Sequence, residues 1–171
     1  MVKIWNAENK IILERKLWLA VLQAQKDLGQ QIPDGVIEDY KKVLDQVDLD
    51  SIHDRERIVK HDVKARIEEF CSLAGHEHIH KGMTSRDLTE NVEQLQIRQA
   101  LELICCQAAA ALRLLSENAT TYSETAVTGR THNVAAQVTT LGKRFASAAE
   151  EMLHAFTNLS LIHISEPTRP Y

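Results

Sequence analysis

Histidine is the residue type in this sequence with the clearest chemical potential, because an imidazole with a pKa of about 6.5 can give or take a proton near neutral pH. His76, His78 and His80 alternate along the chain. On an extended backbone their imidazoles would lie on one side, where they could bind a divalent metal ion. No cysteine or aspartate cluster completes the ligand set, so a solvated polar loop with one functional histidine is the alternative interpretation.

Two further groups of polar residues could contact a substrate. Lys60, His61 and Asp62 place a cation, an imidazole and a carboxylate at successive positions of a helical pattern. They would point in different directions around that helix, and a charged exposed turn is the alternative. Thr84 and Ser85 begin a long predicted helix. Their hydroxyls, the unpaired backbone N–H groups and the positive end of the helix dipole suit a carboxylate or phosphate, and simple helix capping is the alternative.

A fourth group surrounds His132. Gly129 permits close backbone approach, and Thr131 and Asn133 flank the histidine with a hydroxyl and an amide. These neighbours could hold the imidazole in one tautomer as a proton donor. The residues alone therefore predict polar patches on loops and helix starts that could bind an anionic substrate.

Helices must position these groups, because the chain has only 6 Gly, 3 Pro and 5% aromatic residues beside many good helix formers. The predicted fold class is all-α. Helices are predicted over residues 7–28 and 52–74, each followed by a glycine stop, with a short helix through about residue 44 between them. The predicted buried face of the first helix consists of Leu13, Leu17, Val21, Ala24 and Leu28.

The second half of the chain is dominated by one long helix. Residues 85–122 contain no Pro or Gly, which predicts a helix of up to about 55 Å. Residues 100–115 are apolar on nearly every side, so other helices must cover them. Residues 123–138 favour an extended or irregular segment, and a further helix is predicted from 139 to about 158.

Composition excludes several classes of protein. The 171 residues carry 20 Lys and Arg against 24 Asp and Glu, a net charge of −4, which argues against binding nucleic acid. The N-terminus lacks the pattern of a secretion signal, and no uninterrupted apolar run reaches the roughly 18 residues of a membrane span. Three cysteines, two of them adjacent, do not form a disulfide framework, so we expect a cytoplasmic protein.

Three segments, read in order, resemble the adenylosuccinate lyase family of the fumarase/aspartase superfamily. They are the sequences KHDV at residues 60–63, HKGMTSRDLTEN at 80–91 and GRTHNVAAQVTT at 129–140. The resemblance implies three helical domains and a homotetramer with a long central bundle. This chain would be an N-terminal fragment, with an N-terminal helical domain at 1–83 and an incomplete beginning of the central bundle at 84–158.

The resemblance also implies an activity and the residues that perform it. The family releases fumarate by β-elimination from adenylosuccinate, giving AMP, and from the succinylated carboxamide intermediate of purine biosynthesis, with no cofactor and no metal. By motif, His132 matches the general acid. The matching substrate-binding residues are Lys60, His61, Asp62, His80, Thr84, Ser85 and Thr131.

The chain also departs from the family's pattern. The family's base is a serine on a Gly/Ser-rich loop followed by Lys and Asn, and no such segment occurs in these 171 residues. We therefore expect the chain alone to be inactive and poorly stable. Residues 159–171 carry two of the three prolines and resemble the translation of a sequencing-library adapter, so we exclude them from the fold. A genuine C-terminal extension is the alternative.

Two other functions stay open at this point. One is a different fumarate-releasing lyase, or a cycloisomerase, of the same superfamily. The other is a non-enzymatic helical module that binds metal through the alternating histidines or serves as a scaffold.

Overall fold

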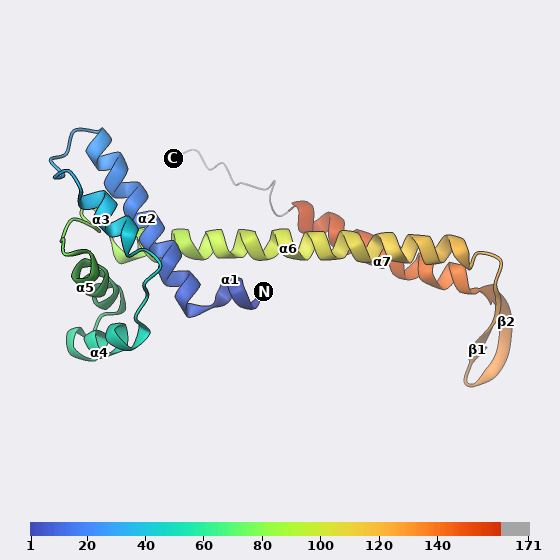
Figure 1. Ribbon diagram of the computed structural model, residues 1–171. Coiled ribbons are helices and arrows are strands. Elements are labelled where there is room, and N and C mark those ends of the chain that lie inside the picture. The colour runs from blue at the N-terminus through green and yellow to red at the C-terminus, as the bar shows by residue number, and fades with distance from the viewer. Residues whose placement is uncertain (162–171) are drawn as a thin grey trace, which may run out of the picture. The chain divides into compact units, whose positions relative to one another are not determined.

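The computed structural model describes residues 1–161 as two compact units, Met1–Ala100 and the described part of Leu101–Tyr171 (Figure 1). The first unit contains α1 (Val2–Trp5), α2 (Ala7–Asp27), α3 (Val36–Lys42), α4 (Leu49–Val59), α5 (Asp62–Ala74) and the beginning of α6 (Ser85–Thr121). The second contains the rest of α6, strands β1 (Ala126–Thr131) and β2 (Val134–Thr140), and α7 (Leu141–Leu161). The predicted all-α fold class is confirmed, with one β-hairpin added.

The core of the first unit is built around three aromatic side chains from three helices. Trp18 of α2 and Phe70 of α5 have ring centroids 6.3 Å apart, and Tyr40 of α3 lies 4.9 Å from Phe70. Leu88 of α6 and Ile79 of the loop before it close the same cluster. The loop from 76 to 84 and the start of α6 are therefore held directly on the core.

The predicted buried face of α2 is wrong. Leu28 is 86% exposed, whereas Trp18 and Leu22 are each 1% exposed. The buried face also contains two charged residues, Glu14 and Arg15, both fully buried. Hydrophobic periodicity counts charged side chains as exposed, so it could not identify the buried face of α2.

The predicted continuous helix over 52–74 is also wrong, because the chain breaks between α4 and α5. Lys60 has a left-handed backbone with φ of 56°, and α5 starts after His61. Asp48 caps α4, accepting a hydrogen bond from the Ser51 N–H at 2.9 Å. No glycine or proline marks the break, which removed the usual sequence signal.

The segment predicted to be extended or irregular forms an antiparallel hairpin. Thr131 pairs with Val134, so only His132 and Asn133 form the turn. Both have positive φ, 46° and 62°, as a type I′ turn requires. The register shifts beside Gly129, where β2 contains one extra residue, Ala136.

Helix α7 begins against the end of α6 at Gly142. A Cβ atom at this position would lie 2.4 Å from the Ala119 carbonyl oxygen and 2.8 Å from Ser123. The Gly142 N–H donates to the Tyr122 carbonyl at 2.9 Å, and the Tyr122 and Phe145 rings lie 5.9 Å apart. Only glycine fits this close approach.

We expect Gly142→Ala to destabilise the packing of α7 on the end of α6 by about 1–3 kcal/mol, because the added methyl group must displace backbone atoms. An alanine free of the clash would instead stabilise the helix by roughly 1 kcal/mol, so the sign of the effect is decisive. Hydrogen exchange of the α7 amides measures it. Ser147→Ala, at an exposed position of the same helix, is the control, and slower exchange in Gly142→Ala would contradict the prediction.

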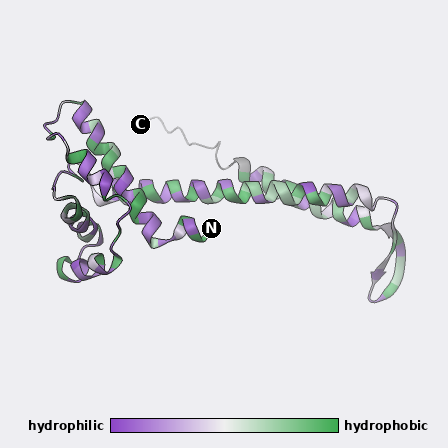
Figure 2. Cartoon of the chain, viewed as in Figure 1, coloured by the Kyte–Doolittle hydropathy of each residue, from purple (hydrophilic) through white to green (hydrophobic). Residues whose placement is uncertain are grey.

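The later part of α6 carries apolar side chains that residues 1–161 leave partly exposed. Figure 2 shows hydrophobic residues along α6 and α7, and Ile104, Leu114 and Leu153 are 37%, 50% and 52% exposed. By length and composition alone α6 could cross a membrane, a test that the central helix of a soluble bundle also passes. The covering helices predicted for residues 100–115 stay a prediction.

Helix α7 runs to Leu161, three residues past the predicted end, and residues 162–171 of the predicted adapter tail lie outside the described part.

Candidate functional site

The start of α6 presents the hydroxyl groups of Thr84 and Ser85 differently. The Thr84 N–H donates to Asp87 Oδ2 at 2.7 Å, and the Thr84 hydroxyl accepts from the Asp87 N–H at 3.4 Å. This is the predicted capping box. Ser85 makes neither of these bonds, and its Oγ lies 3.5 Å from His61 Nε2. Ser85 is therefore the hydroxyl turned toward the neighbouring histidine.

The helix break places His61 at the first turn of α5. Its Nδ1 accepts from the Lys64 N–H at 3.3 Å, so the imidazole caps the helix. The same nitrogen lies 3.6 Å from Asp62 Oδ1. Capping uses the lone pair of Nδ1, so Nε2 is the ring nitrogen turned toward Ser85.

Asp62 is tied to the interior through Arg66. Arg66 donates from Nη2 to Asp62 Oδ2 at 3.0 Å, and its Nε lies 2.7 Å from Glu14 Oε2. The Arg66–Glu14 contact is close but poorly aligned, and neither Glu14 oxygen has a hydrogen-bond partner. Burial alone would raise the pKa of Asp62. The Val63 N–H and Arg66 stabilise the carboxylate and outweigh that effect, so the pKa is lowered. A fully buried carboxylate therefore orients the cation that holds Asp62.

Burial raises the pKa of Glu14 to about 6, against the opposing attraction of Arg66 and Lys10. A raised carboxyl pKa means that the folded state binds the proton more tightly, so Glu14 lowers stability as pH rises from its ordinary value of 4.5 to about 6. We expect the stability of the chain relative to Glu14→Gln to fall by about 2 kcal/mol across that range. Urea unfolding at a series of pH values measures this. Glu8→Gln, an exposed position on the same helix, is the control, and a pH-independent difference for Glu14→Gln would refute the prediction.

His80 lies beside the same helix start. It is half-buried, with a left-handed backbone at φ of 64°, and its Nδ1 accepts from the Trp18 indole N–H at 3.0 Å. The loop around it is also fixed by Gln25, whose side chain donates to the Lys81 carbonyl at 2.8 Å. Asp87 and His61 act electrostatically on His80, so His61, Ser85 and His80 form one group on the first unit. The Lys60 side chain is exposed and lies toward His53, Glu56 and Arg57 of α4.

His132 and Thr131 belong to the second unit and lie at the tip of the hairpin. Both are exposed, and Arg130 Nη1 donates to the Asn133 carbonyl across the turn at 3.1 Å. Histidine and asparagine are among the few residues that tolerate positive φ, which explains their place here. Thr131 and Gly129 also line a hollow of about 460 Å³ with Lys143 and Arg144, so this face of the unit is cationic.

The alternating histidines do not converge. His76 Nε2 pairs with Asp39 at 3.0 Å, and His80 Nδ1 is used by Trp18. Within residues 1–161 no group of three His, Cys, Asp or Glu side chains is placed to hold a metal ion. Hydrogen bonding to His76 and Lys42 lowers the pKa of Asp39, which favours the ion pair.

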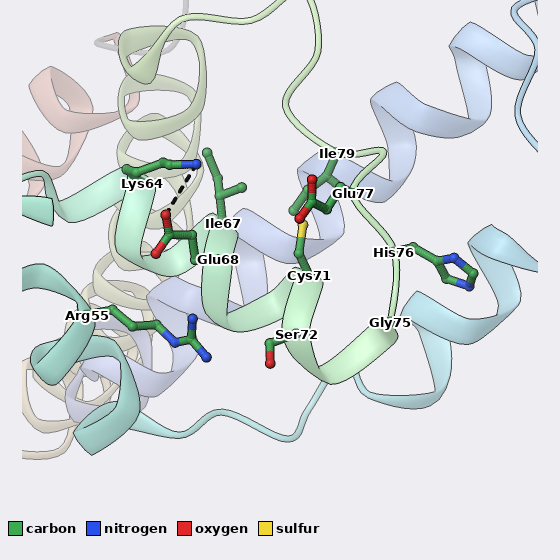
Figure 3. Close-up of a pocket in the computed structure, with 10 residues that line it drawn as sticks. All are labelled: Arg55, Lys64, Ile67, Glu68, Cys71, Ser72, Gly75, His76, Glu77 and Ile79. Carbon is green, nitrogen blue, oxygen red and sulfur yellow. Dashed lines mark ion pairs between the residues drawn. The ribbon is translucent and has the colours of Figure 1, made fainter. Parts of the chain in front are cut away.

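Another hollow of the first unit lies elsewhere, and of the candidate residues named from the sequence it is lined by His76. It encloses about 700 Å³ between α4, α5 and the following loop. Figure 3 shows Lys64 and Glu68 facing one another there, and the two side chains form an ion pair of 3.3 Å. Cys71 follows on the same helix, α5. Burial raises the pKa of the Cys71 thiol, so it is a poor nucleophile.

The supporting residues Trp18, Glu14 and Arg66 were missed by sequence reasoning. The available signal was a tryptophan and the charged run Glu14-Arg15-Lys16 between the apolar residues in the middle of α2. Such residues at core positions need polar partners, so they indicate where the interior contacts a site.

A family model described as "Lyase" matches residues 2–166, and the chain therefore belongs to this lyase family. The resemblance inferred from the three motifs is confirmed by its relatives. The chain is 33% identical to the adenylosuccinate lyase of Caenorhabditis briggsae over 164 residues, covering 94% of this chain and 34% of the relative. It is 34% identical to that of Saccharomyces cerevisiae over 164 residues, covering 92% and 34%.

Solved structures share the fold. The β-carboxy-cis,cis-muconate cycloisomerase of Acinetobacter calcoaceticus superimposes with a TM-score of 0.81 at 22% identity, covering 94% of this chain and 39% of that one. At that identity the likeness shows the fold alone. The chain spans about a third of the length of the curated relatives it matches.

Proposed function

We propose that this chain carries part of the active site of an adenylosuccinate lyase. The reaction is β-elimination of fumarate from adenylosuccinate, giving AMP, and from the succinylated carboxamide intermediate of purine biosynthesis. The relatives named above support the substrate. The observation that carries the proposal is the placement of Ser85 3.5 Å from His61, with His61 and Asp87 acting electrostatically on His80, at the start of α6, where the helix dipole favours an anionic group.

In this reaction a base removes a proton from the carbon beside a carboxylate. The released electron pair forms the C=C bond of fumarate, and the C–N bond breaks with its electrons going to nitrogen. An acid must then protonate the leaving amine. We assign this role to His132, which the hairpin presents on an exposed turn. The base is proposed to come from sequence beyond these 171 residues.

The remaining assignments concern binding. Ser85 and the N–H groups of the α6 start bind substrate oxygen atoms, and Thr84 supports them through its cap. Lys60, His61 and Asp62 contact the nucleotide, and Thr131 lies beside the acid. A homotetramer, in which other subunits cover the apolar part of α6, is part of the same proposal, as is a cytoplasmic location.

A completed enzyme tests the proposal. Residues 1–158 are joined to the part of the Saccharomyces cerevisiae lyase that follows the matched segment, and fumarate release is measured by the loss of the succinylated adenine's ultraviolet absorbance. We expect turnover of adenylosuccinate by the completed enzyme and none by the 171-residue chain alone. Turnover of a carboxymuconate instead, or activity of the chain alone, would overturn the proposal.

A further inference from the structure

Trp18 determines which nitrogen of His80 carries the proton. The indole N–H can only donate a hydrogen bond, and its Nε1 lies 3.0 Å from His80 Nδ1. His80 Nδ1 must therefore present its lone pair, which leaves the proton of the neutral imidazole on Nε2. The two rings meet edge to face, with centroids 5.9 Å apart and an angle of 89°, so the contact also fixes the ring plane.

The donor itself cannot easily move. Trp18 is 1% exposed and packs on Phe70. Ile79, which directly precedes His80 in the loop, is 6% exposed. Two turns further along α2, Gln25 binds the backbone at Lys81. Helix α2 thus holds both the side chain and the backbone of this loop, and the Nε2 edge of His80 is the one left for an outside partner.

The surroundings also oppose a charge on His80. Burial lowers the pKa of His80, the nearby His61 acts in the same direction, and Asp87 acts against them. Protonation would further place a second N–H against the indole N–H, replacing an attraction with a repulsion. His80 is therefore neutral at and above its ordinary titration range, and becomes charged only at lower pH.

His61 differs in this respect, although it lies at the same helix start. Its Nδ1 has a donor, the Lys64 N–H at 3.3 Å, and an acceptor, Asp62 Oδ1 at 3.6 Å. The Nδ1 edge of His61 is thus occupied by residues of α5, and its Nε2 lies 3.5 Å from the Ser85 hydroxyl.

We propose that Trp18 is a positioning residue that fixes His80 as a neutral Nε2–H donor to a substrate oxygen. The tautomer stands on the geometry of the first unit alone, whereas the substrate oxygen rests on the function proposed above.

Nitrogen NMR of the histidine-labelled 171-residue chain reads the tautomer directly. We expect His80 to show a protonated Nε2 and an unprotonated Nδ1 at neutral pH. Trp18→Phe keeps an aromatic ring at this position but removes the N–H donor, so we expect a mixture of tautomers and a higher pKa of His80. Trp5→Phe, at a 52% exposed tryptophan outside this contact, is the matched control and should change neither. A protonated Nδ1 in the unsubstituted chain would overturn the proposal whether or not Trp18→Phe folds.

Two further measurements complete the test. Replacing Trp18 by benzothienylalanine, which has the shape of tryptophan without its N–H, should reproduce the tautomer mixture in a folded chain, and an unchanged tautomer would refute the role of the indole. In the completed enzyme, Trp18→Phe should raise KM about tenfold and leave kcat within about twofold, because the lost donor binds substrate and transition state alike. Unchanged KM and kcat would overturn the positioning role. A completed enzyme without activity but with the expected tautomer would instead count against the proposed function.

Discussion

His132→Asn in the completed enzyme should lower kcat for fumarate release by about 10²–10⁴-fold, the usual contribution of a general acid. Asparagine is the sharpest replacement, because His132 has φ of 46° and asparagine tolerates that backbone. The turn should therefore keep its shape while losing its titratable group. KM should change little, since the acid acts on the leaving nitrogen and not on the bound ground state.

His154→Asn is the matched control, because His154 is an exposed histidine of the same unit with no assigned role. Its kcat should equal that of the unsubstituted enzyme. The limb of the pH–rate profile that reports the protonated acid should disappear in His132→Asn and remain in the control. If His132→Asn retains both full kcat and that limb, the acid lies elsewhere in the chain.

Glu69→Gln should destabilise the 171-residue chain by about 3–5 kcal/mol, because it leaves a buried guanidinium without its counter-charge. Arg15 Nη2 lies 2.6 Å from Glu69 Oε2, with side chains 0% and 2% exposed. Arg15 also donates to the carbonyls of Val43 and Leu44 at 2.9 and 2.7 Å, and lies 4.4 Å from the centre of the Phe70 ring. The pair therefore joins α2, α5 and the end of α3.

Urea unfolding followed by tryptophan fluorescence measures this change, because Trp18 lies in the same core. Glu90→Gln is the matched control. It breaks the Arg86–Glu90 ion pair of 2.8 Å, whose side chains are 81% and 58% exposed, and should cost at most about 1 kcal/mol. Equal effects of the two substitutions would mean that the buried pair contributes no more than a surface pair.

The ends of helices were the most predictable part of the fold. The Thr84–Asp87 cap and the glycine stop at Gly75, with φ of 73°, are local interactions between residues at most a few positions apart. The residue types at these positions are those that helix ends prefer, so the sequence alone indicates them. The break at Lys60 and the turn at His132 were harder, because neither uses glycine, the residue that normally marks positive φ.

The candidate residues of the site were predictable by motif, but their supports were not. Trp18 and His80 are 62 positions apart, and Glu14 reaches Asp62 only through Arg66. Such contacts depend on how α2 packs against α5 and the loop before α6. Hydrophobic periodicity assigned α2 the wrong face because its charged residues are buried, so the partners of those charges could not be foreseen.

The extra residue in β2 limits how this hairpin can change in length. Side chains alternate between the two faces of a strand, and Ala136 shifts that alternation once between Gln137 and the turn. Deleting Ala136 would remove this bulge and leave Thr131 opposite Val134 in a regular ladder, whereas deleting one residue of β1 would shift the pairing of that strand by one residue. Single deletions should therefore be tolerated at Ala136 and selected against in β1, a rule that a library of length variants would reveal without any knowledge of the substrate.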